Sequence, residues 1–287
     1  MKLRHNAPRN RLRAGYLWAG LFLVAVQVFA TTGFAYVLRY TKKTGEVLRW
    51  KESCLRYSLY QEGAPNIPIE SVRETFRAAF DAWEEVDDAY FYFEATEDAS
   101  CGQVGHNLDS GNSNLIVFVS ENWTDDEDPT PRDSRAIALT TTAWDDISGR
   151  LIDADMEFNA VDFIFSTDAA PGTMDLQNTA THEIGHMLGL DESDTWGSTM
   201  YPSASFTETD KRTLSTDDIA AVITLYPIEK DPGICRDPIC GLDLSCSSTA
   251  CSENPFAEND EAAGCTLTSS GHRTSRFHLF DLLTATF

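Results

Sequence analysis

The sequence predicts an α+β domain, because short strand-like runs and longer amphipathic runs occur in the same stretch of chain. Hydrophobic residues make up 42% of the 287 residues and aromatic residues 11%, a composition that supports a buried core. Five runs have the alternation, or the aromatic and β-branched content, that is typical of strands. These runs are residues 55–60, 90–94, 114–120, 136–143 and 151–159.

Three further segments have helical patterns. Residues 69–86 carry apolar side chains three and four positions apart, with charged residues on the opposite face. Residues 174–188 predict a second helix, and Gly189 is its stop signal. Residues 216–226 predict a third helix, for which Ser215 is the candidate N-cap.

The chain is strongly acidic. Aspartate and glutamate outnumber lysine and arginine by 45 to 22, for a formal net charge of -23. Nucleic acids and anionic membrane surfaces attract basic faces, so neither is expected as a partner. The charge would suit a salty or calcium-containing medium. A merely solvated acidic surface, which implies no partner, explains it equally well.

The first residues have the layout of an export signal. A basic head ends at Arg13, an uncharged stretch covers residues 14–38, and small residues stand at Ala30 and Ala35. This order predicts a signal peptide over residues 1–35. An uncleaved signal anchor is the alternative, because the uncharged stretch is long enough to span a bilayer of ~30 Å. We therefore expect a secreted protein, with membrane attachment only if the leader is retained.

Export would bring the seven cysteines into an oxidising medium, where disulfides form. Cys54 and Cys101 lie far from the others in the sequence and are candidates to pair with each other. Because seven is odd, one thiol is left over, pairs outside the chain, or belongs to an incomplete tail. The remaining five lie in a cysteine-rich tail that we expect over residues 228–287: Cys235, Cys240, Cys246, Cys251 and Cys265.

The strongest chemical pattern is His182-Glu183-Ile-Gly-His186 within the second predicted helix. Residues four apart lie on one helix face, so both imidazoles can reach a single metal ion. Glu183 would then lie beside the metal, where its carboxylate can accept a proton from activated water. A chance pattern on an ordinary helix is the alternative for so short a motif.

The residues that follow extend this pattern. Gly189 can turn the chain back towards the metal, and Ser198-Thr-Met200-Tyr-Pro202 comes shortly afterwards. Here the chain resembles the metzincin metallopeptidases, whose signature is HExxHxxGxxH followed by a methionine turn. Within that class it is most similar to the matrixins, the branch that includes the matrix metalloproteinases, and to their secreted bacterial type. Leu214-Ser-Thr-Asp-Asp218-Ile also resembles the start of the last helix of that family.

The resemblance implies a zinc-dependent endopeptidase that acts on proteins or peptides. It implies a metallopeptidase domain over residues 51–227, preceded by a short N-terminal segment over residues 36–50. The expected fold has a twisted mixed sheet, a backing helix, a zinc-binding helix and a C-terminal helix. Met200 would form the turn below the metal and Asp218 would support that turn. Core filling by Met200 and ordinary helix-start acidity of Asp218 are the structural alternatives.

The chain departs from the signature at the third ligand position. The family has a histidine three residues after the glycine, and Glu192 stands there in this sequence. A carboxylate is a competent zinc ligand, so His182, His186 and Glu192 are the expected set, with Asp191 as the neighbouring candidate. Alternatively the third ligand is lost, and the protein is an inactive secreted relative that serves as a binding protein.

A second cation site is a weaker expectation. Asp153, Asp155 and Glu157 alternate along a predicted strand and offer oxygen atoms to calcium, which the resemblance also implies near this point. A plain acidic strand face is favoured over calcium, because calcium requires roughly 6–8 oxygen ligands. We expect the protein to be a monomer.

Overall fold

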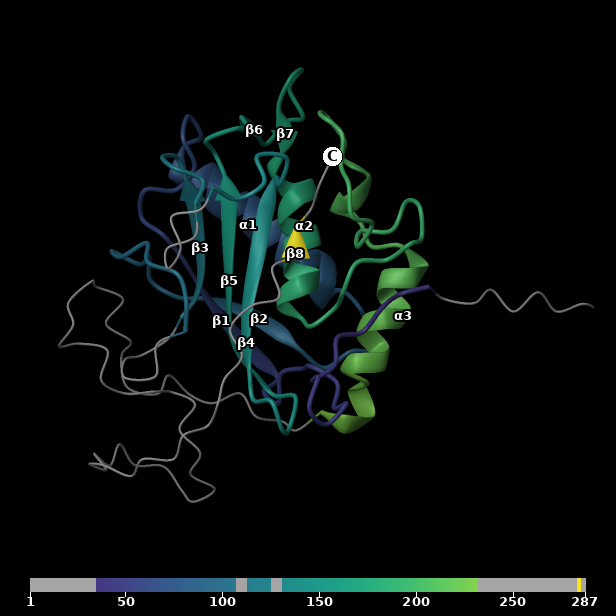
Figure 1. Ribbon diagram of the computed structural model, residues 1–287. Helices are drawn as coiled ribbons and strands as arrows, with labels where there is room; N and C mark the ends of the chain where they lie inside the picture. Colours follow the sequence, from purple (N-terminus) through teal and green to yellow (C-terminus); the bar gives the residue numbers. More distant parts are fainter. Residues whose placement is uncertain (1–34, 107–112, 125–130, 232–282, 285–287) are drawn as a thin grey trace, which may run out of the picture. The chain divides into compact units, whose positions relative to one another are not determined.

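The computed structural model describes residues 35–106, 113–124, 131–231 and 283–284 (Figure 1). These residues form the α+β fold that the sequence predicts. The strands are β1 (Cys54–Leu59), β2 (Tyr92–Ala95), β3 (Asn114–Val119), β4 (Ala138–Trp144), β5 (Leu151–Asn159), β6 (Phe165–Ser166), β7 (Met174–Asp175) and β8 (Leu283–Thr284). The helices are α1 (Ile69–Glu84), α2 (Leu176–Met187) and α3 (Thr216–Leu225), with short 3-10 helices η1 (Asp210–Arg212) and η2 (Ile228–Lys230).

The main sheet is mixed, and its strand order is β2-β1-β3-β5-β4-β8. Three neighbouring pairs are parallel: β2 with β1, β1 with β3, and β3 with β5. The tight connection between β5 and β4 makes that pair antiparallel. The short strand β8 pairs antiparallel with Leu139 and Thr140, and so adds to the outer edge of β4.

The core lies between the sheet and two helices, α1 and α2, on one of its faces (Figure 1). The apolar stripe of α1 is buried as its spacing predicts, from Val72 to Trp83. Phe76 in this stripe contacts the rings of Phe118 on β3 and Phe158 on β5. The Trp83 indole donates to the carbonyl of Thr181 at 2.9 Å, which ties the backing helix to α2.

The second helix starts two residues later than the sequence pattern predicts. Met174 and Asp175 form β7 instead of the first helical turn. Asp175 has an extended backbone, and its carboxylate accepts from the amide of Asn178 at 2.9 Å, as an N-cap residue does. The third helix begins as predicted, with Ser215 as its N-cap and Asp218 completing a capping box.

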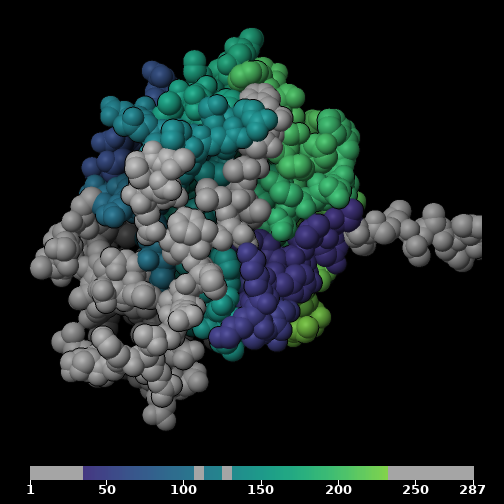
Figure 2. All heavy atoms as spheres, viewed as in Figure 1, coloured from purple at the N-terminus to yellow at the C-terminus, as the bar shows by residue number. Residues whose placement is uncertain are grey.

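The segment before the first strand is built into the domain. Leu38 forms a β-bridge with Leu190, and Leu48 and Trp50 are 1% exposed. The amides of Ala35 and Tyr36 donate to the carboxylate of Asp217 at the start of α3. Figure 2 accordingly shows this segment, in purple, lying against the green C-terminal part of the domain.

Two predicted regions lie outside the described residues. The predicted leader, residues 1–35, is described only at Ala35, and the five cysteines of the predicted tail are not described at all. Within the part of the chain that the structure describes, no helix has the length and apolar character needed to cross a membrane.

The hydrogen bonds of the Tyr226 hydroxyl allow a test of how the two ends of the domain are held together. This hydroxyl donates to the carbonyl of Leu188 at 2.6 Å and accepts from the amide of Trp50 at 3.1 Å. Tyr226→Phe would remove both of these hydrogen bonds from the interior. We expect the free energy of unfolding to fall by about 2 kcal/mol, measured by urea denaturation. The exposed Tyr40 supplies the control, since Tyr40→Phe should change the midpoint little.

Candidate metal centre

Helix α2 places two imidazole rings side by side in the interior. His182 and His186 are 1% and 0% exposed, and their Nε2 atoms lie 3.2 Å apart. The four-residue spacing that the sequence shows is therefore realised on one helix face. Both rings come from the most deeply buried stretch of the helix, so their orientation is fixed by packing.

The main chain sets the tautomer of each ring. Nδ1 of His182 lies 2.7 Å from the carbonyl oxygen of Thr199, and Nδ1 of His186 lies 3.0 Å from that of Leu190. A carbonyl only accepts, so each Nδ1 carries a proton and each neutral ring has a lone pair on Nε2. Two such lone pairs facing each other at 3.2 Å repel unless a cation lies between them. The donor set therefore fits a metal ion.

Glu192 brings a carboxylate oxygen to the same two nitrogen atoms. Its Oε1 lies 3.7 Å from Nε2 of His182 and 3.7 Å from Nε2 of His186. Tetrahedral zinc with ligand bonds of about 2.0–2.2 Å separates its ligand atoms by roughly 3.3 Å, so all three separations are close to those of a zinc site. Among the described residues, this is the only group of three His, Cys, Asp or Glu side chains whose ligand atoms lie within 4.8 Å of one another.

Asp191 is placed differently. Its amide donates to the carbonyl of Val37 at 2.9 Å, and its carboxylate accepts from the amide of Glu192 at 2.9 Å. It is absent from the convergent group. Of the two candidates that the sequence left open, the structure thus brings Glu192 to the histidines and leaves Asp191 outside.

Gly189 makes this return of the chain sterically feasible. Its φ is +95°, in the region that favours glycine, and a Cβ there would lie 2.5 Å from the carbonyl oxygen of Leu48. The amide of Leu190 then bonds the carbonyl of Gly185 at 3.0 Å. Any larger residue at 189 would push the chain away from Leu48 and shift Glu192 with it.

Glu183 lies next to the two histidine nitrogens and the Glu192 oxygen. One of its own carboxylate oxygens accepts a hydrogen bond and, within the described residues, the other does not. Glu183 is 0% exposed, and its Oε2 accepts from the Thr140 hydroxyl of β4 at 2.6 Å. No group among the described residues donates to its Oε1. Burial raises the pKa of Glu183, although the neighbouring histidines oppose that effect. A carboxylate with a raised pKa holds a proton more readily than an ordinary carboxylate, which suits a group that first accepts and then releases one.

The pKa of Glu192 shifts the other way. Burial favours its neutral form, but the adjacent rings of His182 and His186 outweigh burial and hold the pKa well below its ordinary value. The lowered pKa favours the anionic form of Glu192, which is the form in which a carboxylate can bind a metal ion.

Met200 forms the floor beneath the two histidines. It is 2% exposed, and a Cβ added to Gly185, between the histidines in sequence, would lie 2.2 Å from its Sδ. The carboxylate of Asp218 accepts from the amides of Thr199 at 2.8 Å and of Met200 at 3.1 Å. Asp218 therefore braces the turn whose Thr199 carbonyl orients His182.

Three polar residues of this region were not singled out by the sequence patterns. Thr140 holds Glu183, Asp217 bonds the Ser193 hydroxyl at 2.7 Å, and Lys211 is buried nearby at 4% exposure. Thr140 lies on a strand far away in sequence, so no local pattern marks it. Asp217 lies within the motif that begins at Leu214 but has no role assigned by it, and Lys211 belongs to no pattern.

The acidic stripe of β5 is buried, and it is not a solvated face. Asp153, Asp155 and Glu157 are 3%, 2% and 3% exposed. Asp155 accepts from two amides, and burial raises its pKa to about 7. Glu157 pairs with Arg132 at 2.7 Å. The three carboxylates do not converge as one ligand group among the described residues, so calcium stays a prediction.

The α+β fold, the two imidazoles beside a buried glutamate on one helix and the methionine beneath them are features of the metzincin metallopeptidases, which have a histidine at the position that Glu192 occupies here. Comparison with known families is more specific. The family model Peptidase_M10, Matrixin, matches residues 49–227, and the chain belongs to that family.

Curated relatives agree with this assignment. Metalloendoproteinase 1-MMP of Arabidopsis thaliana is 29% identical over 199 residues, which cover 62% of this chain and 44% of the relative. Metalloendoproteinase 2-MMP of the same plant is 30% identical over 200 residues, covering 69% and 48%. Human neutrophil collagenase is 24% identical over 184 residues, covering 64% and 34%. The chain thus spans less than half the length of each of these relatives.

The match places residues 49–227 in a family whose relatives are named as metalloendoproteinases and a collagenase. The relatives compared are plant and mammalian proteins, so a bacterial type stays a prediction.

Asp218 provides a test of the brace below the histidines. Asp218→Ala removes the acceptor for the amides of Thr199 and Met200. Because hydrogen bonds to a buried charge are lost, we expect the free energy of unfolding to fall by about 2–3 kcal/mol. Chemical denaturation of the metal-free protein measures this, and the exposed Asp210→Ala is the matched control. Equal stability of the two variants would exclude a bracing role.

Proposed function

We propose that this protein is a secreted zinc endopeptidase that hydrolyses peptide bonds in proteins through activated water. One observation carries the proposal. Two Nε2 lone pairs and one carboxylate oxygen converge at 3.2 Å and 3.7 Å beside a buried glutamate that has a free oxygen. Membership of the matrixin family supports the same chemistry.

Zinc would be held by Nε2 of His182, Nε2 of His186 and Oε1 of Glu192. When bound, zinc supplies Lewis-acid polarisation of water and of the scissile carbonyl. Three protein ligands leave the fourth position open for that chemistry, as in other catalytic zinc sites. The bonds from Nδ1 to main-chain carbonyls keep both rings in the ligating tautomer.

Glu183 would act as the general base and then as the general acid. Its Oε1, which has no donor among the described residues, takes the proton of the attacking water. The Thr140 hydroxyl holds Oε2, so the carboxylate keeps Oε1 directed at the reacting atoms. The same oxygen then delivers the proton to the leaving amine. The raised pKa that burial gives Glu183 favours this second transfer.

The substrate would lie along the outer edge of β4. Extended peptides commonly bind by adding a strand to a sheet edge. β8 forms this type of pairing with Leu139 and Thr140, and Thr140 also contacts Glu183. A peptide paired at the same residues would therefore pass beside the general base, and β8 would compete with it for this edge.

Export is part of the proposal. The leader layout of residues 1–35 supports it, and a disulfide between Cys54 and Cys101, which we expect from the sequence, would suit an oxidising compartment. A retained leader would attach the protein to a membrane. We expect the exported protein to be a monomer.

Glu183→Gln separates chemistry from metal binding. The amide keeps the size of the side chain and an acceptor for Thr140 but cannot take a proton. We expect kcat on a generic protein substrate to fall by about 10²–10⁴-fold, with stoichiometric zinc retained. Zinc content by elemental analysis and casein hydrolysis with and without a chelator measure both properties.

The exposed Glu62→Gln serves as the control and should leave activity unchanged. Tightly bound zinc without hydrolysis in the wild type would favour the inactive binding protein. Absence of stoichiometric zinc would refute the peptidase proposal.

Glu192 and Asp191 can be distinguished by zinc affinity. Glu192→Gln removes the ligating charge, and we expect the zinc dissociation constant to rise roughly a hundredfold or more. Asp191→Asn keeps an oxygen for the amide of Glu192 and should change affinity little. Glu192→His, which restores the family's ligand, should bind zinc tightly. Competition with a zinc indicator measures all three, and a larger loss in Asp191→Asn would reverse the assignment.

A further inference from the structure

A buried lysine lies close to the metal centre and is not part of it. Lys211 belongs to η1 and is 4% exposed. Its ammonium donates to the main-chain carbonyl of Tyr201, the residue that follows Met200. Lysine is rarely buried to this extent without an ionic partner. Glu183, which would act on the substrate, is itself fully buried, so burial does not separate Lys211 from the reaction.

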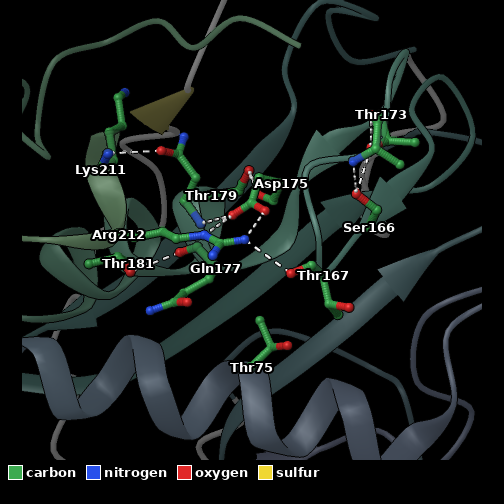
Figure 3. Close-up of polar contacts among 12 residues, drawn as sticks. Thr75, Ser166, Thr167, Thr173, Asp175, Gln177, Thr179, Thr181, Lys211 and Arg212 are labelled. Atoms are coloured by element: carbon green, nitrogen blue, oxygen red, sulfur yellow. Dashed lines mark hydrogen bonds and ion pairs between the residues drawn. The ribbon is translucent and has the colours of Figure 1, made fainter. Parts of the chain in front are cut away.

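The backbone of Lys211 is fixed to the beginning of the metal-binding helix. Its amide donates to Oδ1 of Asn178 at 2.8 Å. The neighbouring Arg212 pairs with Asp175, the N-cap of α2, and bonds the carbonyl of Thr167 at 3.0 Å (Figure 3). Figure 3 also shows the Lys211 side chain extending away from this Arg212–Asp175 pair. Asp175 thus neutralises the charge of Arg212. The ammonium of Lys211 lies away from that pair, at the carbonyl of Tyr201.

The carboxylates of the centre act on Lys211 from a distance. Burial lowers its pKa, while Glu208, Glu192, Glu183 and Asp218 favour the ammonium form. None of these carboxylates, nor any other among the described residues, forms an ion pair with Lys211 within 4.0 Å. The ammonium therefore has three N–H groups and one acceptor, the carbonyl of Tyr201.

We propose that Lys211 is a specificity-determining residue, which binds the carboxylate of an aspartate or glutamate of the substrate next to the scissile bond. The proposal rests on the proposed peptidase function. Two N–H groups of the ammonium are available to such a carboxylate, and a charge-assisted hydrogen bond would complete the coordination of a cation that lacks an ionic partner.

A bound zinc ion would offset part of the negative charge around Lys211. With zinc bound, the two positive charges of the ion balance the carboxylates of Glu183 and Glu192. Glu208 and Asp218 also act on Lys211, but neither forms an ion pair with it. An acidic side chain would be attracted at short range although the protein as a whole repels it.

The test begins with the cleavage sites of the zinc-loaded wild type in a mixture of denatured proteins, read by mass spectrometry. We expect aspartate and glutamate to be enriched at one position beside the cleaved bond. A peptide pair that differs only by Glu or Gln at that position then gives kcat/KM. The Glu peptide should be preferred roughly tenfold to a hundredfold, and the preference should shrink at high salt.

Lys211→Met should abolish the preference, Lys211→Arg should retain it, and Lys211→Glu should favour a Lys peptide. The exposed Lys230→Met is the matched control and should keep the wild-type ratio. Hydrolysis without acidic enrichment, or a Glu/Gln ratio unchanged in a folded, zinc-loaded Lys211→Met, overturns this inference alone. Absence of hydrolysis on every substrate overturns the proposed function first. If Lys211→Met fails to fold, the wild-type Glu/Gln ratio still decides.

Discussion

Two hydrogen bonds from histidine Nδ1 atoms to main-chain carbonyls determine the rest of the site. They require the carbonyls of Leu190 and Thr199 to point back at helix α2. A loop that follows a helix does not hold its carbonyls in such positions without support. The remainder of the local structure supplies that support: Gly189 reverses the chain, Asp218 binds the turn at Thr199, and the amide of Ser193 donates to the carbonyl of Met200 at 2.7 Å.

The same requirement explains why distant segments meet at the end of α2. The last turn of a helix leaves carbonyls without intrahelical partners. The carbonyl of Met187 accepts from the Trp50 indole at 2.8 Å, and that of Leu188 accepts from the Tyr226 hydroxyl. Trp50 lies before the first strand and Tyr226 follows the last helix. Both ends of the domain thus satisfy the helix that carries the histidines, which couples folding of the whole domain to the geometry of the site.

The sequence predicted what local spacing encodes. Alternation located β1 to β5 within a few residues, and the spacing of His182 and His186 together with Gly189 and Met200 located the centre. Contacts between residues far apart in the chain could not be read in this way. Thr140, which donates a hydrogen bond to Glu183, lies 43 positions from it in the sequence. The amide of Leu115, which donates to the buried carboxylate of Asp155, lies 40 positions from that residue. Periodicity describes which face of an element is apolar, and it does not specify which polar groups meet across the fold.

The substitution at position 192 has a consequence that depends on charge. With zinc bound, a third histidine would leave the ion and Glu183 with one net positive charge, whereas Glu192 reduces that sum to zero. Lys211, buried on the Met200 side of the centre, adds one positive charge again without contacting the ligands. The two residues lie 19 positions apart and interact electrostatically. In the proposed centre a carboxylate ligand would lower the positive charge at the metal, and the ammonium of Lys211 would supply a positive charge on the Met200 side, where a substrate side chain would lie.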